Sequence, residues 1–197
     1  IGRMAFNFNE MVDNIESKIY EMQSINSLNE YLLKGDSPAT LMTYAVKQFC
    51  AATGAQIGYL GFFEQSSKEK LMGSANFGIS ENNLEDMELR LKVLVNKLSD
   101  EEIHFLPEYT AKNFNTENLF ILKIRPQSEP LIDVSEVLQE ISDHEKSEVK
   151  LQIEGFLVLG SYDENSMNEE KLDFLHSFAS QTGTVILKAY LDNVKKD

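Results

Sequence analysis

The chain has 197 residues, an apolar fraction of 42% and a formal net charge of −14 at pH 7. This length accommodates one domain with a helical extension, and the apolar fraction suits a packed core. Because the negative charge repels phosphates and anionic headgroups, we expect neither nucleic-acid binding nor direct membrane contact. Cys50 is the single cysteine and can form no internal disulfide, which fits a reducing compartment.

Near the beginning of the chain, apolar residues recur at steps of three and four, which is the spacing of a coiled coil. We expect one long helix, or two abutting helices, over residues 1–34. The expected homodimer seam comprises Met4, Phe8, Met11, Ile15, Ile19, Met22 and Ile25. Two successive steps of four, between residues 11 and 19, depart from a strict heptad and would locally unwind a coiled coil. The alternative is a monomer whose first helix folds back on its own domain.

The rest of the chain alternates between strand and helix patterns. The segment from Gly35 to Pro38 predicts the end of the first helix and the cap of a second one over 38–52. Strands are predicted at 56–64, 71–77, 103–106, 118–125 and 151–162, and further helices at about 80–98 and 168–191. A short amphipathic helix on a surface excursion is predicted within 126–150. Since consecutive strands are mostly linked as hairpins, we expect an antiparallel sheet with packed helices, an α+β fold.

Three stretches carry a family likeness: Ala52 to Ala55 followed by QIGYLGFF, Glu154 to Ser161, and Leu172 to Leu175. With them, residues 36–191 resemble a GAF domain, the ligand-sensing fold of phosphodiesterases, phytochromes and many bacterial receptors. The resemblance implies a central antiparallel sheet flanked by helices, with a pocket between one face and lid elements. It also implies terminal helices on the other face that often form a dimer interface. A PAS domain is the nearest alternative fold, and the long helices at both ends favour GAF.

The beginning of the chain resembles the second half of a HAMP domain through Ile1, Gly2, Met4, Phe8, Asn9 and Met11. HAMP domains are dimeric relays between a membrane-spanning helix and a cytoplasmic signalling module. The two resemblances imply a HAMP helix at 1–20, a connecting helix at 21–35, a GAF-like sensor domain at 36–191 and a linker to an output domain from 192–197. We therefore expect the cytoplasmic portion of a bacterial inner-membrane receptor, of the two-component histidine kinase or the nucleotide or diguanylate cyclase type.

Residue types that perform chemistry are sparse. Cys50 falls in the second predicted helix, where a buried inert thiol is the expected state rather than a bilin attachment site. The histidines at positions 104, 144 and 176 form no metal-binding motif, and His176 lacks the residues that follow a phospho-acceptor histidine. The residue set of cyclic-nucleotide-binding GAF domains cannot be threaded through 100–180. We therefore expect no catalytic residue and no metal site, and the cofactor is unknown.

Aromatic residues of the predicted strands and lid are the remaining candidates for ligand binding. The candidate pocket residues are Tyr59, Phe63, Phe77, His104, Phe105, Tyr109 and Phe120. A packed core accounts for most of them without a ligand, and His104 is either a pocket ligand for haem or an anion or an ordinary polar contact.

The sequence thus predicts a signal-transduction module that senses a small molecule, relays helix movement, or does both. One alternative is a dimerisation spacer with an empty pocket. The other is an enzyme similar to the GAF-fold methionine sulfoxide reductases, which need several cysteines in the pocket region.

Overall fold

The computed structural model describes residues 2–64, 71–95, 97–98, 103–106, 108–112, 114–125, 153–162, 164 and 167–194. The predicted surface excursion at 126–150 lies outside these residues. The helices are α1 (Gly2–Leu33), α2 (Pro38–Thr53), α3 (Glu81–Val95), α4 (Glu108–Lys112) and α5 (Glu169–Val194). The strands are β1 (Ile57–Glu64), β2 (Leu71–Phe77), β3 (Ile103–Leu106), β4 (Leu119–Ile124) and β5 (Ile153–Gly160).

Local turn and cap residues begin and end the helices. The Ser37 side chain accepts a hydrogen bond from the backbone N–H of Thr40, and Pro38 occupies the first turn of α2. Gly54 ends α2 with a left-handed φ of 67°, which a residue without a Cβ adopts at little cost. The Asn168 side chain accepts from the Lys171 N–H at 2.8 Å and caps α5. Because these signals are local, the sequence predicts them well.

The five strands form one antiparallel sheet in the order β2-β1-β5-β4-β3. The pairing of β1 with β5 joins the first and the last strand of the chain at the centre of the sheet, from Ile57 opposite Gly160 to Glu64 opposite Ile153. The α+β prediction, with a central antiparallel sheet flanked by helices, is therefore confirmed. The sequence does not predict α4, since a helix of five residues is too short to show a periodic pattern.

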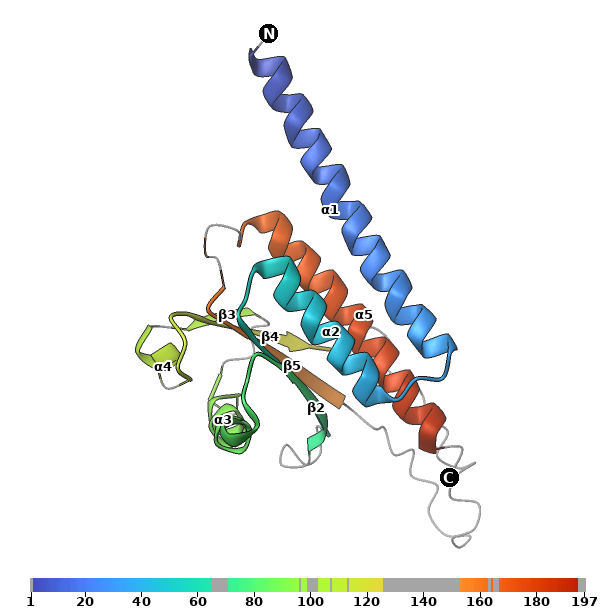
Figure 1. The fold of residues 1–197 in the computed structure, drawn as a ribbon, viewed down its shortest axis with the longest axis vertical. Coiled ribbons are helices and arrows are strands. Elements are labelled where there is room, and N and C mark those ends of the chain that lie inside the picture. The colour runs from blue at the N-terminus through green and yellow to red at the C-terminus, as the bar shows by residue number, and fades with distance from the viewer. Residues whose placement is uncertain are drawn as a thin grey trace, which may run out of the picture.

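Helices cover both faces of the sheet (Figure 1). On the face called here the helical face, α2 and α5 pack side by side on the strands, and α1 packs across both of them. On the opposite face, called the α3 face, α3 and α4 lie against the sheet. The sheet therefore separates two apolar clusters that share no buried side chain.

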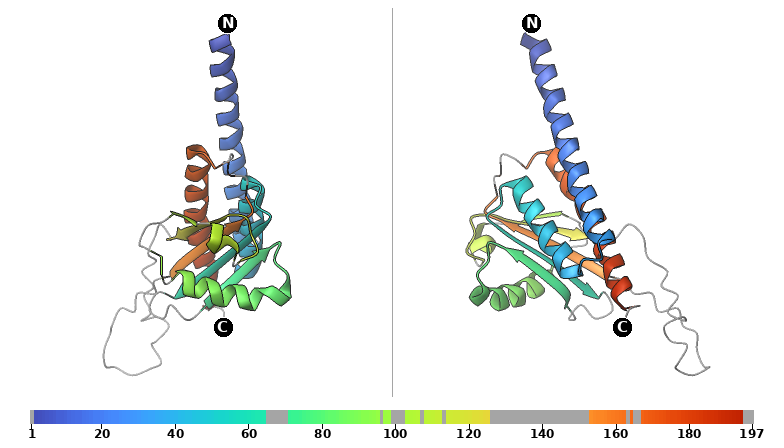
Figure 2. Two further views of the ribbon diagram at one scale, coloured as in Figure 1. Left: turned by 90° about the vertical axis from the view of Figure 1, so that its left-hand side faces the viewer. Right: turned by 45° about the vertical axis from the view of Figure 1, so that its right-hand side comes forward.

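Helix α1 extends well beyond the globular part. Figures 1 and 2 show its N-terminal half projecting past α2 and the start of α5, while its C-terminal half lies along α5. Leu28 is fully buried in the core of the helical face, and the Tyr20 hydroxyl donates to Gln48 Oε1 at 2.9 Å. The Tyr20 ring also packs on Phe174, with ring centroids 5.9 Å apart. The docking of α1 therefore begins at about Tyr20.

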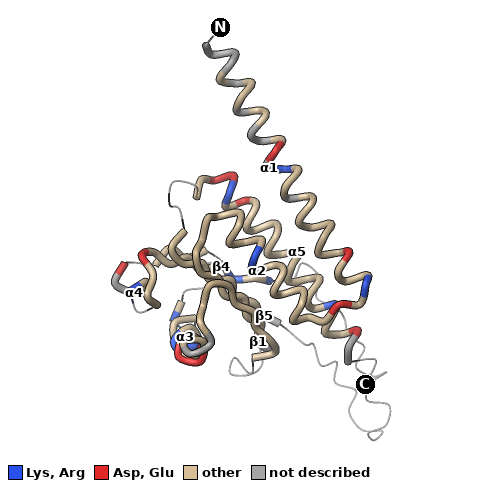
Figure 3. Tube along the Cα trace, viewed as in Figure 1, with Lys and Arg blue, Asp and Glu red and all other residues tan. Residues whose placement is uncertain are grey.

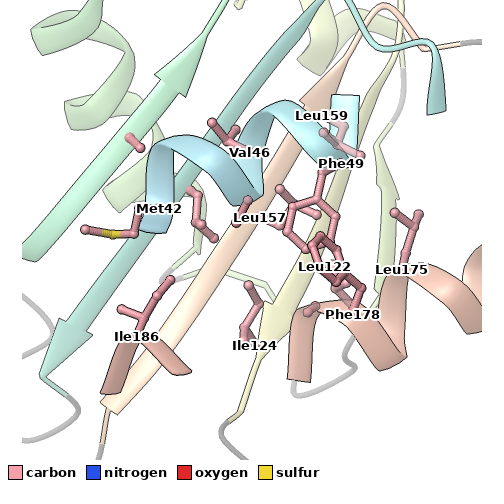
Figure 4. Packing of buried hydrophobic residues seen from close by; sticks show 14 of the residues in the cluster. Met42, Val46, Phe49, Leu122, Ile124, Leu157, Leu159, Leu175, Phe178 and Ile186 are labelled. Atoms are coloured by element: carbon pink, nitrogen blue, oxygen red, sulfur yellow. The ribbon is translucent and has the colours of Figure 1, made fainter. Parts of the chain in front are cut away.

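The core of the helical face is close-packed around glycine positions of the sheet. Figure 4 shows Val46 and Phe49 of α2 above Leu157 and Leu159 of β5, with Phe178 of α5 beside them. A Cβ at Gly58 would collide with Cys50 Sγ and lie 2.9 Å from Val46 Cγ2. Glycine in β1 is therefore what allows α2 to approach the sheet this closely.

We expect Gly58→Ala to lower the free energy of unfolding by about 1–3 kcal/mol, since the added methyl group overpacks the contact with α2. Urea unfolding followed by circular dichroism measures this change. Cys50→Ala removes the nearer of the two clashing atoms, so the double variant should lose less stability than the sum of the single variants. Strict additivity of the two changes would contradict the contact.

Candidate functional site

The α3 face is the candidate site, because it combines aromatic residues of the sheet with buried polar groups. One row of residues crosses all five strands on this face: Asn76, Tyr59, Val158, Ile121 and His104 stand opposite one another in the strand register. Met87 and Leu91 of α3 and Ala111 of α4 cover this row. The polar groups of this face lie in two places, one at β1, β2 and α3 and the other at β4 and β5.

The structure divides the seven predicted pocket residues between the two faces. Tyr59 and Phe63 are buried on the α3 face, and His104 stands opposite Ile121 of the same face. Phe120 is buried in the core of the helical face, and Phe105 stands beside it with ring centroids 5.2 Å apart.

Phe77 pairs with Gly58 and shares its face, the helical one. The side chain of Tyr109 lies outside the described side chains. A pocket under α3 would therefore draw on Tyr59, Phe63 and His104, while Phe77, Phe105 and Phe120 belong to the opposite side of the sheet.

A polar cluster joins β1 and β2 to α3. The Tyr59 hydroxyl donates to Glu88 Oε1 at 3.0 Å, and the Ser74 hydroxyl donates to the same oxygen at 2.9 Å. Burial raises the pKa of Tyr59, and the negative charge of Glu88 raises it further, so the phenol stays protonated and acts as a donor. Gly61 makes room for this arrangement, because a Cβ there would lie 2.8 Å from Tyr59 Cε1.

A second polar group lies toward β4 and β5. Lys123 is only 7% exposed, and its register partner Phe156 belongs to the core of the α3 face. Beyond it, Arg125 Nε lies 3.9 Å from Glu154 Oε1, at the long limit of an ion pair. Sequence reasoning missed Lys123 and Glu88. A lone lysine within the apolar run NLFILKIR was the available signal, since a charge there must be buried or at an edge.

This arrangement places Lys123, Tyr59 and Glu88 on one face of the sheet. Within the residues that the structure describes, no group of three or more His, Cys, Asp and Glu could hold a metal ion. Among the described helices, none is long and apolar enough to cross a membrane.

Most of the predicted dimer seam lies on the surface of α1. Phe8, Met11, Ile15, Ile19 and Met22 are each at least half exposed. Ile25 instead packs against the core of the helical face, and the side chain of Met4 lies outside the described side chains. The homodimer remains a prediction, and the exposed part of its predicted seam runs from Phe8 to Met22.

Solved structures share this fold although their sequences differ widely. No protein-family model and no curated protein sequence matches the chain. The GAF domain of a protein described as a sensor histidine kinase from Pseudomonas syringae pv. tomato is 13% identical, with a TM-score of 0.57, covering 95% of this chain and 99% of its own. The GAF domain of a phosphoenolpyruvate-protein phosphotransferase from Acinetobacter is 14% identical, with a TM-score of 0.55 and coverage of 88% and 96%.

A third similar structure is an N-acylhomoserine lactone dependent LuxR family transcription factor from Burkholderia cenocepacia. It is 8% identical, with a TM-score of 0.52, covering 90% of this chain and 99% of its own. At these identities the likeness concerns the fold alone. The chain has the fold of a GAF domain, which is the fold that its sequence predicted.

We expect Tyr59→Phe to lower the free energy of unfolding by about 1.5–3 kcal/mol, because the phenol donates to a charged acceptor. Tyr190→Phe is the matched control, since its hydroxyl donates to the neutral carbonyl of Met72 and should be worth about 0.5–1.5 kcal/mol. Urea unfolding at pH 7 compares the two variants. An equal or smaller loss in Tyr59→Phe would contradict a charge-assisted bond to Glu88.

Cys50 is buried, as predicted, and burial raises its pKa from 9.0 to about 12. We expect no reaction with dithionitrobenzoate at pH 8 in the native protein and full reaction in urea, because the thiolate is the nucleophile. Lys47→Cys, exposed on the same helix, is the positive control. Since the folded pKa is the higher one, the stability gained from the protonated thiol is complete below pH 9 and is lost as the pH rises toward 12. Rapid native labelling of Cys50 would contradict its burial.

Proposed function

We propose that this chain is a signal-transduction module of a multidomain receptor, in which the GAF-fold domain senses a small molecule and passes a change in helix packing along the chain. The main supporting observation is the packing of α1 on α5. These two helices run in the same direction, and Gly2 and Val194 lie at opposite ends of the molecule (Figure 1). A displacement that enters through α1 therefore reaches α5 by direct contact.

The contact between the helices has a defined anchor. Tyr20, Leu28 and Ser24 hold the second half of α1 against α2 and α5, with both hydroxyls directed at Gln48 Oε1. The first half has no such support in the described domain and projects beyond it. A rotation or shift of the projecting half would therefore strain the anchor and bias the packing of α5.

A homodimer completes the proposal. Five apolar side chains on α1, from Phe8 to Met22, are exposed on one side of the helix, and a second copy of the chain would bury them. The resemblance of the first residues to a HAMP relay supports a place behind a membrane segment, on the cytoplasmic side of the inner membrane. The relay would then feed an output domain of the kinase or cyclase type.

Ligand sensing is assigned to the α3 face. Tyr59, Lys123 and Glu88 would recognise a small molecule there, and α3 lies where a bound molecule would move it. We assign no catalysis to this segment, since its single thiol is buried and protonated at neutral pH.

Native mass spectrometry of the purified protein tests assembly and ligand together. We expect a dimer with an additional small-molecule mass, which supports sensing and identifies the ligand class. An empty dimer would favour a relay or spacer over a sensor. A monomer at micromolar concentration would overturn the dimer and the relay built on it.

Phe8→Asp should abolish the dimer and leave the globular domain folded, because it places a charge in the proposed interface far from the anchor at Tyr20. Phe6→Asp is the matched control: Phe6 is 68% exposed and Phe8 64%, but the two side chains point to nearly opposite sides of the helix. Sedimentation and circular dichroism report assembly and folding. If both variants dimerise equally well, the exposed side of α1 is not the interface.

A further inference from the structure

The exposed side of α1 continues beyond Met22 to the end of the helix. It forms what we call the outer stripe: Phe8, Met11, Ile15, Ile19, Met22, Asn26, Asn29 and Leu33. Steps of three or four residues keep these positions on one side of a helix. Each of them is exposed, and Leu33 reaches 86%. The stripe therefore runs the length of the described helix from Phe8 onward.

The outer stripe points away from the domain to which α1 belongs. Ser24 and Leu28 are buried against that domain, and they lie about half a turn from Met22 and Asn26 around the helix axis. A partner on the stripe would therefore meet α1 without colliding with α2, α5 or the sheet. In a two-stranded pair, the two domains would lie on opposite sides of the paired helices.

The uncharged composition of the stripe suits pairing with a second copy of the same chain. None of its eight positions is charged, although 25% of the residues of the chain are. Figure 3 shows charged residues on α1 in the middle of the helix and near its end, and none of them belongs to the stripe. A neutral contact avoids the repulsion between two chains that each have a net charge of −14.

The exposed area is also large enough for pairing. Six apolar side chains of the stripe, each at least half exposed, leave on the order of 600 Å² in water, which is the largest patch usual on a monomer. This approaches the roughly 800 Å² that each partner buries in a standard interface.

Asn26 and Asn29 distinguish between possible partners and orientations. They follow Met22 at steps of four and three, so they occupy core positions of a coiled coil that continues from Ile19. A buried asparagine amide opposite an apolar side chain would lose its hydrogen bonds, whereas two asparagines opposite each other can satisfy one another. A single asparagine pair in a coiled-coil core specifies register and oligomer state at a cost in stability.

We propose that a second copy of this chain pairs with the outer stripe in parallel and in register, with Asn26 and Asn29 each facing its own counterpart. This inference rests on the homodimer of the proposed function, and it adds the orientation, the register and the residues that determine them. Only this pairing places the two steps of four residues, from Met11 to Ile19, opposite the same steps in the second chain. An antiparallel pair with fully overlapped stripes would set Asn26 opposite Ile15.

Disulfide cross-linking measures the orientation. In the parallel pair, Met11→Cys lies opposite itself and should oxidise to a covalent dimer. In the fully overlapped antiparallel pair, two copies of residue 11 would be about 28 Å apart, and residue 11 would lie opposite residue 30. A mixture of Met11→Cys and Glu30→Cys chains should therefore yield mainly the 11–11 product. Cys50 is buried and does not compete.

The role of Asn26 is tested in the same assay with Asn26→Leu. We expect about tenfold tighter association together with a loss of uniqueness: 11–30 products or assemblies larger than a dimer appear beside the parallel dimer. Asn83→Leu on α3, the same substitution at an exposed helical position outside the stripe, should change neither the association nor the products.

The outcomes separate the two levels of the proposal. A wild-type protein that is monomeric by native mass spectrometry overturns the dimer itself. A wild-type dimer that gives no 11–11 product leaves the dimer standing and overturns the parallel register. An Asn26→Leu variant with unchanged affinity and only parallel products shows that Asn26 does not determine the pairing.

Discussion

The antiparallel pairing of β1 with β5 is the constraint on which the rest of the structure depends. It brings Ile57 of the first strand opposite Gly160 of the last one, across about a hundred residues of chain. Once these strands are central, β2 lies on one side and β4 and β3 on the other. The register then decides which residues face α2 and α5 and which face α3, because neighbours along a strand point to opposite faces. The two faces therefore carry different sets of side chains.

The helical face is built for rigid packing. Gly58 lets α2 lie close against β1, and Phe49 and Phe178 from two helices meet with ring centroids 4.8 Å apart. The α3 face keeps polar groups beside apolar ones, with Tyr59 and Ser74 held by one carboxylate oxygen of Glu88. The sheet therefore has a close-packed helical layer on one face and a partly polar, helix-covered layer on the other.

Helix α1 belongs to the domain and at the same time extends from it. Its inner side is held by Tyr20 and Leu28, while its outer stripe has no contact within the described chain that would bury it. One helix therefore contributes to the core with one side and exposes an apolar stripe on the other. The inner side of α1 holds the residues that stabilise the domain, and the outer side holds the residues of the proposed dimer contact.

The sequence by itself determined the fold class and the described elements other than α4. Helix caps, turn glycines and periodicity depend on neighbouring residues, so the end of α1 at Gly35 and the cap of α2 at Ser37 could be assigned from local patterns. Tertiary structure alone decided the faces. Strand register placed Phe120 with the helices and Tyr59 with α3, and it buried Lys123 beside Phe156. The way α1 packs on its domain turned Ile25 toward the core and left Asn26 exposed. A spacing of three or four residues defines one side of a helix, but it does not say which neighbouring residues contact the domain.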